Sequence, residues 1–185
     1  PPLRDMSDPP SQGQPDHWSD YNSSLDLNND GAPDDNGGVH RNSGIPNKAA
    51  YLVSAGGTHS GYVVPGIGQA KTQRLWYAVL TQHLGSSSSF LSARNAFVSA
   101  AASFAKSGKH SFNAGDACTV RNAFAAVGLG SGDVDCDGTE DVVENDDDDD
   151  GVPDTKDNCP LQWNSGQVDQ DKDGLSRNNV LVRID

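Results

Sequence analysis

Residues 90–107 read FLSARNAFVSAAASFAKS, and this stretch predicts the fold class. Its apolar side chains recur three or four residues apart, which places them on one face of an α-helix. They are Phe90, Ala93, Phe97, Ala101 and Phe104. Ser89 precedes the run as an N-cap, and Gly108 follows it as a stop. The stretch therefore predicts one long amphipathic helix, with alanines small enough to let a second helix approach closely.

Three flanking segments have the same helical period. One begins near Ser43, carries Pro46 in its first turn and ends at Gly56-Gly57; another runs from about Thr72 to Leu84; the last ends at Gly128. Their apolar faces consist of Ile45, Ala49, Leu52, Val53, Leu75, Val79, Leu80, Ala117, Val120, Phe124 and Val127. Four such helices can share one core. We therefore predict a mainly α domain over residues 1–130, whose residues 1–44 form a long ordered loop region.

The net charge of the chain is confined to its C-terminal part. Residues 1–130 hold nine acidic and nine basic side chains, whereas residues 131–185 hold 17 acidic and four basic ones, which is the whole net charge of −13. Such a balance argues against a nucleic-acid partner, which needs clustered Lys and Arg. No run of 18 apolar residues occurs, so we predict no membrane span. We expect two units, residues 1–130 and residues 131–185.

Two acidic segments share the spacing of a calcium loop, in which carboxylates at positions 1, 3 and 5 precede a glycine at position 6. Calcium takes six to eight oxygen ligands, and the glycine permits the turn that lets them converge. A backbone carbonyl at position 7 and carboxylates at positions 9 and 12 complete the set. The predicted ligands are Asp133, Asp135, Asp137, Thr139, Asp141 and Glu144 in the first loop, and Asp146, Asp148, Asp150, Val152, Asp154 and Asp157 in the second.

Other segments repeat this spacing less completely. A third loop begins Asp169-x-Asp171-x-Asp173-Gly174 and then loses its later carboxylates, and an earlier echo starts at Asp26 but has Gly37 at position 12. A turn-rich loop is the simpler account of the echo. An acidic, disordered run remains the alternative for the whole segment, because Asp146 to Asp150 are five consecutive aspartates. The glycine at position 6 of both complete loops favours ion binding.

The three cysteines are Cys118, Cys136 and Cys159, so at most one internal pair can form. Pairing of Cys136 with Cys159 is conceivable in an oxidising compartment. The sequence leaves the pairing open.

A candidate catalytic group stands at residues 35–40, which read DNGGVH. The Gly37-Gly38 turn would let Asp35 fold back and accept a hydrogen bond from the ring of His40, which fixes the tautomer of the ring. An imidazole oriented in this way can stabilise an oxyanion. From spacing alone, a histidine that merely caps a helix is an equal alternative.

Longer strings resemble the thermolysin-like metallopeptidases over about residues 3–129. They include RDMSDP (4–9), PDHWS (15–19), DNGGVHRNSGI (35–45), NKAAYL (47–52), GGTH (56–59), LTQ (80–82) and AFAAVG (123–128). The resemblance implies the helical C-terminal lobe of a secreted zinc endopeptidase that cleaves on the amino side of bulky apolar residues with zinc-activated water. It implies that His40 stabilises the oxyanion and that Asp35 orients His40. It also implies that Arg4 binds the substrate carbonyl and that Leu3 lines the apolar pocket. It leaves His17 and His59 structural.

The acidic segment resembles thrombospondin type 3 repeats over about residues 131–175, on the strength of Asp157-Asn158-Cys159-Pro160 with Asn164 and Gln167. That family implies calcium-filled loops that form a stiff spacer or attachment module. Cys159 lacks the expected partner in the following loop, and residues 178–185 do not continue the repeat.

No His-Glu-x-x-His motif occurs in this sequence. We therefore expect the zinc ligands and the general base in an N-terminal lobe of the same protease, and expect this polypeptide by itself to be inactive. A non-enzymatic, calcium-dependent adhesion module with a vestigial peptidase lobe is the open alternative.

Overall fold

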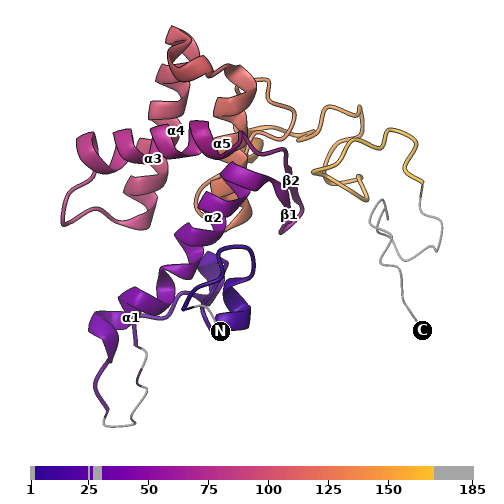
Figure 1. The fold of residues 1–185 in the computed structure, drawn as a ribbon. Coiled ribbons are helices and arrows are strands. Elements are labelled where there is room, and N and C mark those ends of the chain that lie inside the picture. The colour runs from indigo at the N-terminus through magenta and orange to yellow at the C-terminus, as the bar shows by residue number, and fades with distance from the viewer. Residues whose placement is uncertain (1–2, 25, 27–30, 169–185) are drawn as a thin grey trace, which may run out of the picture.

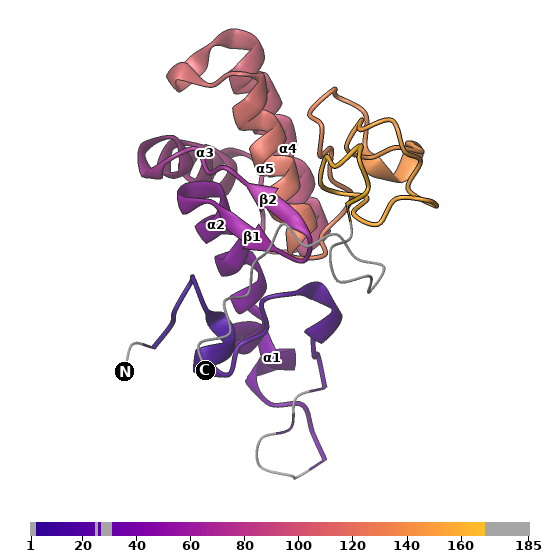
Figure 2. The same cartoon turned by 90° about the vertical axis from the view of Figure 1, so that its right-hand side faces the viewer.

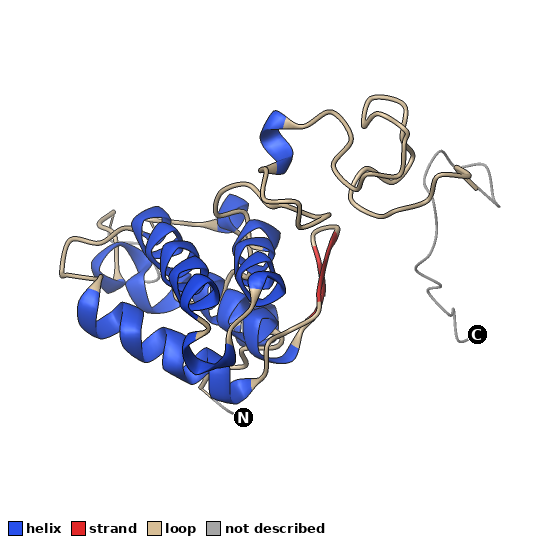
Figure 3. Cartoon of the chain, turned by 90° about the horizontal axis from the view of Figure 1, so that it is seen from above, coloured by secondary structure: helices blue, strands red, loops and turns tan. Residues whose placement is uncertain are grey.

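The computed structural model describes residues 3–24, 26 and 31–168, and it is mainly helical, as the sequence predicts (Figures 1 and 3). Two short 3₁₀ helices, η1 (Pro9–Gln12) and η2 (Trp18–Asp20), come first. The remaining elements are α1 (Asp35–Asn42), α2 (Gly44–Ala55), β1 (Gly57–His59), β2 (Tyr62–Val64), α3 (Gln69–Gln82), α4 (Phe90–Ser107), η3 (Lys109–Ser111), α5 (Ala114–Ala126) and η4 (Asp141–Val143). Within the described residues, no helix is both long and apolar enough to cross a lipid bilayer.

The core forms around α5, which packs against α4, α2 and β2. Phe124 of α5 stacks on Phe97 of α4 with ring centroids 5.3 Å apart, and Trp76 of α3 lies 4.2 Å from Phe97. Most of the predicted apolar faces are buried here, including Ile45 and Leu52. Leu80 is an exception, because its side chain is 57% exposed on the outer face of α3. The prediction that it joins Leu75 and Val79 in the core is wrong.

Helix boundaries follow local chemistry. The side chain of Ser89 accepts the Ser92 amide hydrogen at 3.1 Å and starts α4, which ends at Gly108 in a left-handed conformation. At the start of α5, Asn113 and Asp116 form a reciprocal capping box that the sequence analysis did not predict. Such caps satisfy amide groups that have no partner in the first turn of a helix.

A small antiparallel hairpin follows α2, and the sequence analysis missed it. β1 and β2 pair with Gly57 opposite Val64 and His59 opposite Tyr62. The hairpin returns close to the end of α2. A Cβ on Gly56 would lie only 2.6 Å from the Val64 carbonyl oxygen, so glycine leaves room for this approach. As a result, β2 packs against α5, and Tyr62 reaches the acidic segment.

The acidic segment is attached to the helical domain by a disulfide bond between Cys118 of α5 and Cys136. The Cα atoms of the two cysteines are 5.6 Å apart, within the range that a disulfide spans. Pairing of Cys136 with Cys159 is therefore wrong. One helical turn from Cys118, the buried amide of Asn122 accepts from the Asp133 N–H at 2.7 Å and donates to the Asp133 carbonyl at 2.8 Å. Figures 1 and 2 show the orange loops beside α5 and the hairpin.

Candidate functional site

The candidate catalytic turn is made by consecutive left-handed residues. Asp35, Asn36, Gly37 and Gly38 all have positive φ angles, between 49° and 79°, before the chain enters the right-handed part of α1. At Gly38 a Cβ would lie 2.7 Å from the Asn22 carbonyl oxygen, so a side chain does not fit. The turn reverses the chain within five residues. Asp35 and His40 therefore meet, as the sequence predicts.

The carboxylate of Asp35 holds His40 at two points. One oxygen is hydrogen-bonded to Nδ1 of the His40 ring, and the other accepts the His40 backbone N–H at 2.8 Å. The hydrogen bond from His40 is the main cause that lowers the pKa of Asp35. The Asp35 side chain is 19% exposed, whereas that of His40 is 75% exposed. The ring is therefore anchored on its Nδ1 side and presented to solvent on the other.

Arg4 lies against the same turn. Its Nη1 donates to the His40 carbonyl oxygen at 3.0 Å, which joins the N-terminal segment to the turn across 36 residues. Leu3, the residue before it, is 85% exposed. The structure thus brings Arg4, Asp35 and His40 together and leaves the apolar side chain of Leu3 on the surface beside them.

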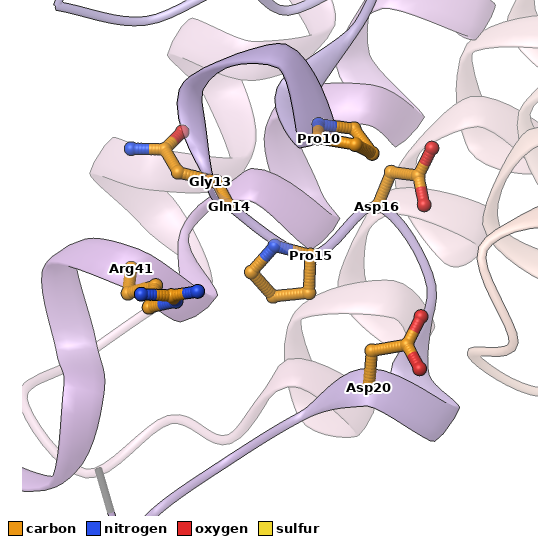
Figure 4. Close-up of a pocket in the computed structure, with 7 residues that line it drawn as sticks. All are labelled: Pro10, Gly13, Gln14, Pro15, Asp16, Asp20 and Arg41. Carbon is orange, nitrogen blue, oxygen red and sulfur yellow. The ribbon is translucent and has the colours of Figure 1, made fainter. Parts of the chain in front are cut away.

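A nearby surface hollow of about 290 Å³ does not coincide with this group (Figure 4). Its lining is Pro10, Gly13, Gln14, Pro15, Asp16, Asp20 and Arg41. Figure 4 shows Arg41 and the carboxylates of Asp16 and Asp20 on opposite sides of Pro15. Because none of the predicted site residues lines it, this hollow is not the proposed catalytic centre.

His17 and His59 both take part in packing. The ring of His17 accepts a hydrogen bond from the Ser19 N–H. It also packs against Gly128, where an added Cβ would lie 2.7 Å from the ring. The ring of His59 lies 6.5 Å from that of His17 and contacts the Asp16 carbonyl oxygen at 3.3 Å. Burial is the main cause that lowers the pKa of His59. These contacts connect the N-terminal segment to the end of α5 and to the hairpin.

The two acidic loops have the same internal hydrogen bonds. In each, the carboxylate at position 9 accepts the position 2 amide hydrogen: Asp141 from Val134 at 2.8 Å, and Asp154 from Asp147 at 2.9 Å. The position 6 glycine donates to the position 1 carboxylate, and the position 7 amide donates to the position 5 carboxylate, in both loops. The sequence repeat thus corresponds to a structural repeat.

Each loop gathers its first three carboxylates. One oxygen from each of Asp133, Asp135 and Asp137 lies within 4.8 Å of the others, and the same holds for Asp146, Asp148 and Asp150. In the described residues, these two aspartate triplets are the groups compact enough for a metal ion. A set made only of carboxylate oxygens suits calcium better than zinc, whose protein sites are built mainly from His and Cys. In the described part of this chain, neither of these groups fits the zinc site that the family implies.

The second loop contains an unsatisfied buried oxygen. Asp148 is 6% exposed, and its Oδ2 has no hydrogen-bond partner in the structure. Burial, followed by repulsion from Asp150, raises the pKa of Asp148 to about 6. Next to it, burial and the charge of Asp154 raise the pKa of Asp147 to about 7. A buried carboxylate oxygen without a donor is costly unless a cation or proton compensates it.

The remaining predicted ligands are placed around the triplets. Glu144 and Asp157 each have one buried oxygen without a hydrogen-bond partner. The carbonyl of Thr139 accepts a long hydrogen bond from Arg121, and Val152 donates its amide hydrogen to Asp150. The carboxylates at positions 1, 3 and 5 of the third loop, Asp169, Asp171 and Asp173, lie outside the described residues. In the echo before them, Asp26 accepts from the Gly31 amide at 2.9 Å, while residues 27–30 are not described.

Among the side chains of the helical domain that contact the first loop, Arg121 and Tyr62 reach the carboxylates of predicted calcium ligands, and the sequence analysis missed both. Arg121 of α5 donates to the Asp133 carboxylate at 2.8 Å, and the hydroxyl of Tyr62 in β2 donates to the Asp141 carboxylate at 3.0 Å. Burial is the main cause that raises the pKa of Tyr62. Arg121 lies three residues after Cys118, on the same face of α5, but this position becomes a signal only once the pairing of Cys118 with Cys136 is known. Tyr62 carried no comparable signal.

Known proteins match the helical part of the chain. Residues 1–129 match the family described as thermolysin metallopeptidase, alpha-helical domain. Bacillolysin from Bacillus cereus is 43% identical over 128 residues, which cover 69% of this chain and 20% of that protein. Thermolysin from Alicyclobacillus acidocaldarius is 44% identical over 127 residues, covering 69% of this chain and 21% of that protein.

A bacillolysin from Brevibacillus brevis is 41% identical over 128 residues, which cover 69% of this chain and 22% of the relative. The chain therefore spans about a fifth of the length of the relatives it matches. The family match extends over more than half of the chain and ends at residue 129, three residues after α5. Through the helical domain of residues 1–129, this chain belongs to the thermolysin metallopeptidase family.

Proposed function

We propose that this chain supplies the substrate-facing, oxyanion-stabilising side of a secreted zinc endopeptidase. The observation that carries the proposal is the pair formed by Asp35 and the exposed ring of His40. A histidine that served only to cap a helix would not need a carboxylate on its Nδ1 side and an open Nε2 side. The family membership of residues 1–129 supports a peptidase origin for this arrangement.

Each residue of the group has a distinct role in this proposal. His40 donates a hydrogen bond from its exposed side to the oxygen that becomes negative when a peptide carbonyl is attacked. Asp35 is a positioning residue, because it fixes the ring and its tautomer. Arg4 binds a substrate carbonyl, and Leu3 offers apolar surface to a bulky side chain of the substrate. Zinc, held by another lobe of the protease, would supply the Lewis acid that activates water.

The test uses the complete protease. The substitution His40→Ala should lower kcat by about 100-fold or more, the usual effect of losing one oxyanion donor. His83→Ala is the matched control, because His83 is an exposed histidine at the end of α3 and makes no described hydrogen bond to Asp35, His40 or Arg4. A kcat for His40→Ala equal to that of the control would remove the catalytic role. Residues 1–185 by themselves should show no chelator-sensitive cleavage of casein.

An extracellular location is part of the same proposal. The disulfide between Cys118 and Cys136 is typical of oxidising compartments. Recovery of the protein from a culture supernatant with this bond intact would support secretion, whereas a reduced, cell-retained protein would contradict it.

We propose in addition that the acidic segment binds calcium and becomes stiff when it does so. The unpartnered Oδ2 of buried Asp148 supports this proposal, because Asp148 belongs to a compact triplet of carboxylates that has no cation beside it in the hydrogen-bond or ion-pair contacts described. Asp133, Asp135, Asp137, Thr139, Asp141 and Glu144 would hold one ion, and Asp146, Asp148, Asp150, Val152, Asp154 and Asp157 the other. Such a segment suits a spacer or an attachment module.

Calorimetric titration of the full chain with calcium tests this second proposal. The wild-type protein should give saturable heat, and Asp148→Asn should remove the second site. Asp149→Asn is the matched control, because it makes the same charge change in the same run of aspartates, at a side chain that is exposed and outside the triplet. Equal effects of the two substitutions would show that only total charge matters, and an absence of heat would exclude calcium binding.

A further inference from the structure

Arg121, a cation of the helical domain, contacts two predicted calcium ligands of the first acidic loop. The Nη1 atom of Arg121 is 2.8 Å from Oδ2 of Asp133, which is position 1 of the loop, and 3.4 Å from the Thr139 carbonyl oxygen, which is position 7. Both are oxygens that the loop pattern assigns to calcium. The guanidinium group therefore already satisfies part of the ligand set of the first loop.

The position of Arg121 is fixed from several directions. Asp133 is only 3% exposed, and its main chain is held by the two hydrogen bonds to Asn122. The disulfide between Cys118 and Cys136 binds the middle of the loop to the helix turn that precedes Arg121. Because α5 and the loop cannot separate easily, the guanidinium remains beside Asp133.

The second loop provides a comparison within the same molecule. It has the same internal hydrogen bonds and the same aspartate triplet, but the charges that act on Asp148 are those of Asp150, Asp157 and Asp146, all acidic. Among the described ion pairs, Arg121–Asp133 is the one that reaches a triplet. A guanidinium is therefore paired with the triplet of the first loop, whereas the described ion pairs place no cation on the triplet of the second loop.

We propose that Arg121 is a built-in competitor of calcium at the first loop, so that the two loops fill at different calcium concentrations. This inference rests on the calcium proposal above. Binding of an ion to the first loop must overcome repulsion by the guanidinium and weaken its hydrogen bonds to Asp133 and Thr139. In the ion pairs described, the triplet of the second loop has no such opponent, so this loop fills first. Removal of the charge should make the first loop bind more tightly and leave the second unchanged.

The experiment is calcium titration calorimetry on the full chain, with each loop isolated in turn. Asp148→Asn leaves the first loop to be measured, and Asp135→Asn leaves the second. In the Asp148→Asn background, Arg121→Gln should tighten calcium binding by at least about tenfold, since loop affinity depends on local charge over several decades. In the Asp135→Asn background, Arg121→Gln should change the affinity less than about twofold.

A matched control separates contact from general charge. Lys106 lines the same hollow beside α5 as Arg121 and Asp133, but donates to neither loop in the hydrogen bonds described. Lys106→Gln removes one positive charge from this region and should leave both affinities nearly unchanged. If it tightens the first loop as much as Arg121→Gln does, the competitor role is excluded.

The remaining outcomes are also decisive. An unchanged or weaker first site in Arg121→Gln would overturn the inference while leaving the calcium proposal intact, and weakening would mean that Arg121 positions Asp133 for the ion. Absence of calcium heat in every protein, wild type included, would overturn both. If Arg121→Gln does not fold, Arg121→Met keeps more of the aliphatic packing and carries the same expectation.

Discussion

The carboxylate of Asp35 is hydrogen-bonded to both the ring and the main-chain amide of His40, through a different oxygen in each case. The second contact fixes the backbone from which the ring extends, so Asp35 controls the position of the imidazole as well as its tautomer. The left-handed residues between them are what make this double contact possible.

Asp35→Asn should therefore impair catalysis without abolishing it. An asparagine can still accept the amide hydrogen through its oxygen, but its NH₂ group cannot accept a hydrogen bond from Nδ1 of the ring, so it no longer fixes the ring in the same way. In the complete protease we expect kcat to fall by about 10- to 100-fold, the usual effect of losing a group that orients a catalytic side chain. Asp34→Asn, one residue earlier, should leave kcat nearly unchanged; an equal loss there would point to a general charge effect.

Gly44→Ala should destabilise the helical domain. A Cβ at this position would lie 2.3 Å from the Pro15 carbonyl oxygen and 2.8 Å from the Gln14 side chain, so the N-terminal segment would have to move off the start of α2. We expect a loss of about 2 kcal/mol in the free energy of unfolding, measured by denaturant titration. Gly85→Ala is the control, because no atom lies within 4 Å of its added Cβ. Similar stability of the two variants would argue against the close packing of residues 14–15 on Gly44.

Loss of the disulfide should destabilise the first loop and its junction with α5. The bond closes a loop with a sequence separation of 18, for which removal costs about 3 kcal/mol. Cys118→Ser should lower the melting temperature, whereas Cys159→Ser, which lies outside this bond, should have little effect. Mass spectrometry of peptides from the unreduced protein gives an independent check: a peptide joining Cys136 to Cys159 would contradict the pairing described here.

Acid should weaken the contacts of the N-terminal segment with the hairpin through His59. Burial, together with the positive Lys48 and the neighbouring His17, lowers the pKa of His59 below its ordinary value of 6.5, against the opposing charge of Asp16. The unfolded chain then takes up the proton first as the pH falls. Stability from this group is complete above about pH 7 and declines as the pH falls toward 5.

The His59 effect can be isolated by a substitution. His59→Asn should reduce the loss of melting temperature between pH 7 and pH 5 by about 2–3 °C, a small effect because the ring is only partly buried. His83→Asn, at an exposed histidine, should leave the pH dependence as it is in the wild type. An unaltered pH dependence in His59→Asn would mean that other groups carry the acid sensitivity.

Much of the helical domain could be predicted because its signals are local. The spacing of Phe97, Ala101 and Phe104 indicates one face of a helix, and Ser89 and Gly108 mark its ends. The Asp35–His40 contact was predictable for the same reason, since five residues and two glycines confine the geometry. Leu80 shows the limit of periodicity: it lies next to Val79 on the helix, but the neighbouring helices cover only one of the two.

The contacts that join the two parts of the chain could not be predicted in the same way. Tyr62 and Asp141 are 79 residues apart, and no spacing rule connects a hairpin tyrosine with the ninth position of an acidic loop. The disulfide was open on the sequence because three cysteines allow several pairings, and the choice depends on how α5 approaches the loop. Arg121 became recognisable as a partner of Asp133 only when that approach was known.

The place where the chain leaves α5 has a steric consequence. Figures 1 and 2 show the orange loops beside the hairpin, at the far end of α2 from the turn in α1 that bears His40. A large partner bound to those loops would therefore lie at the opposite end of α2 from α1. If the chain acts as proposed, attachment to a surface or a matrix through these loops would leave the α1 end accessible to a protein substrate.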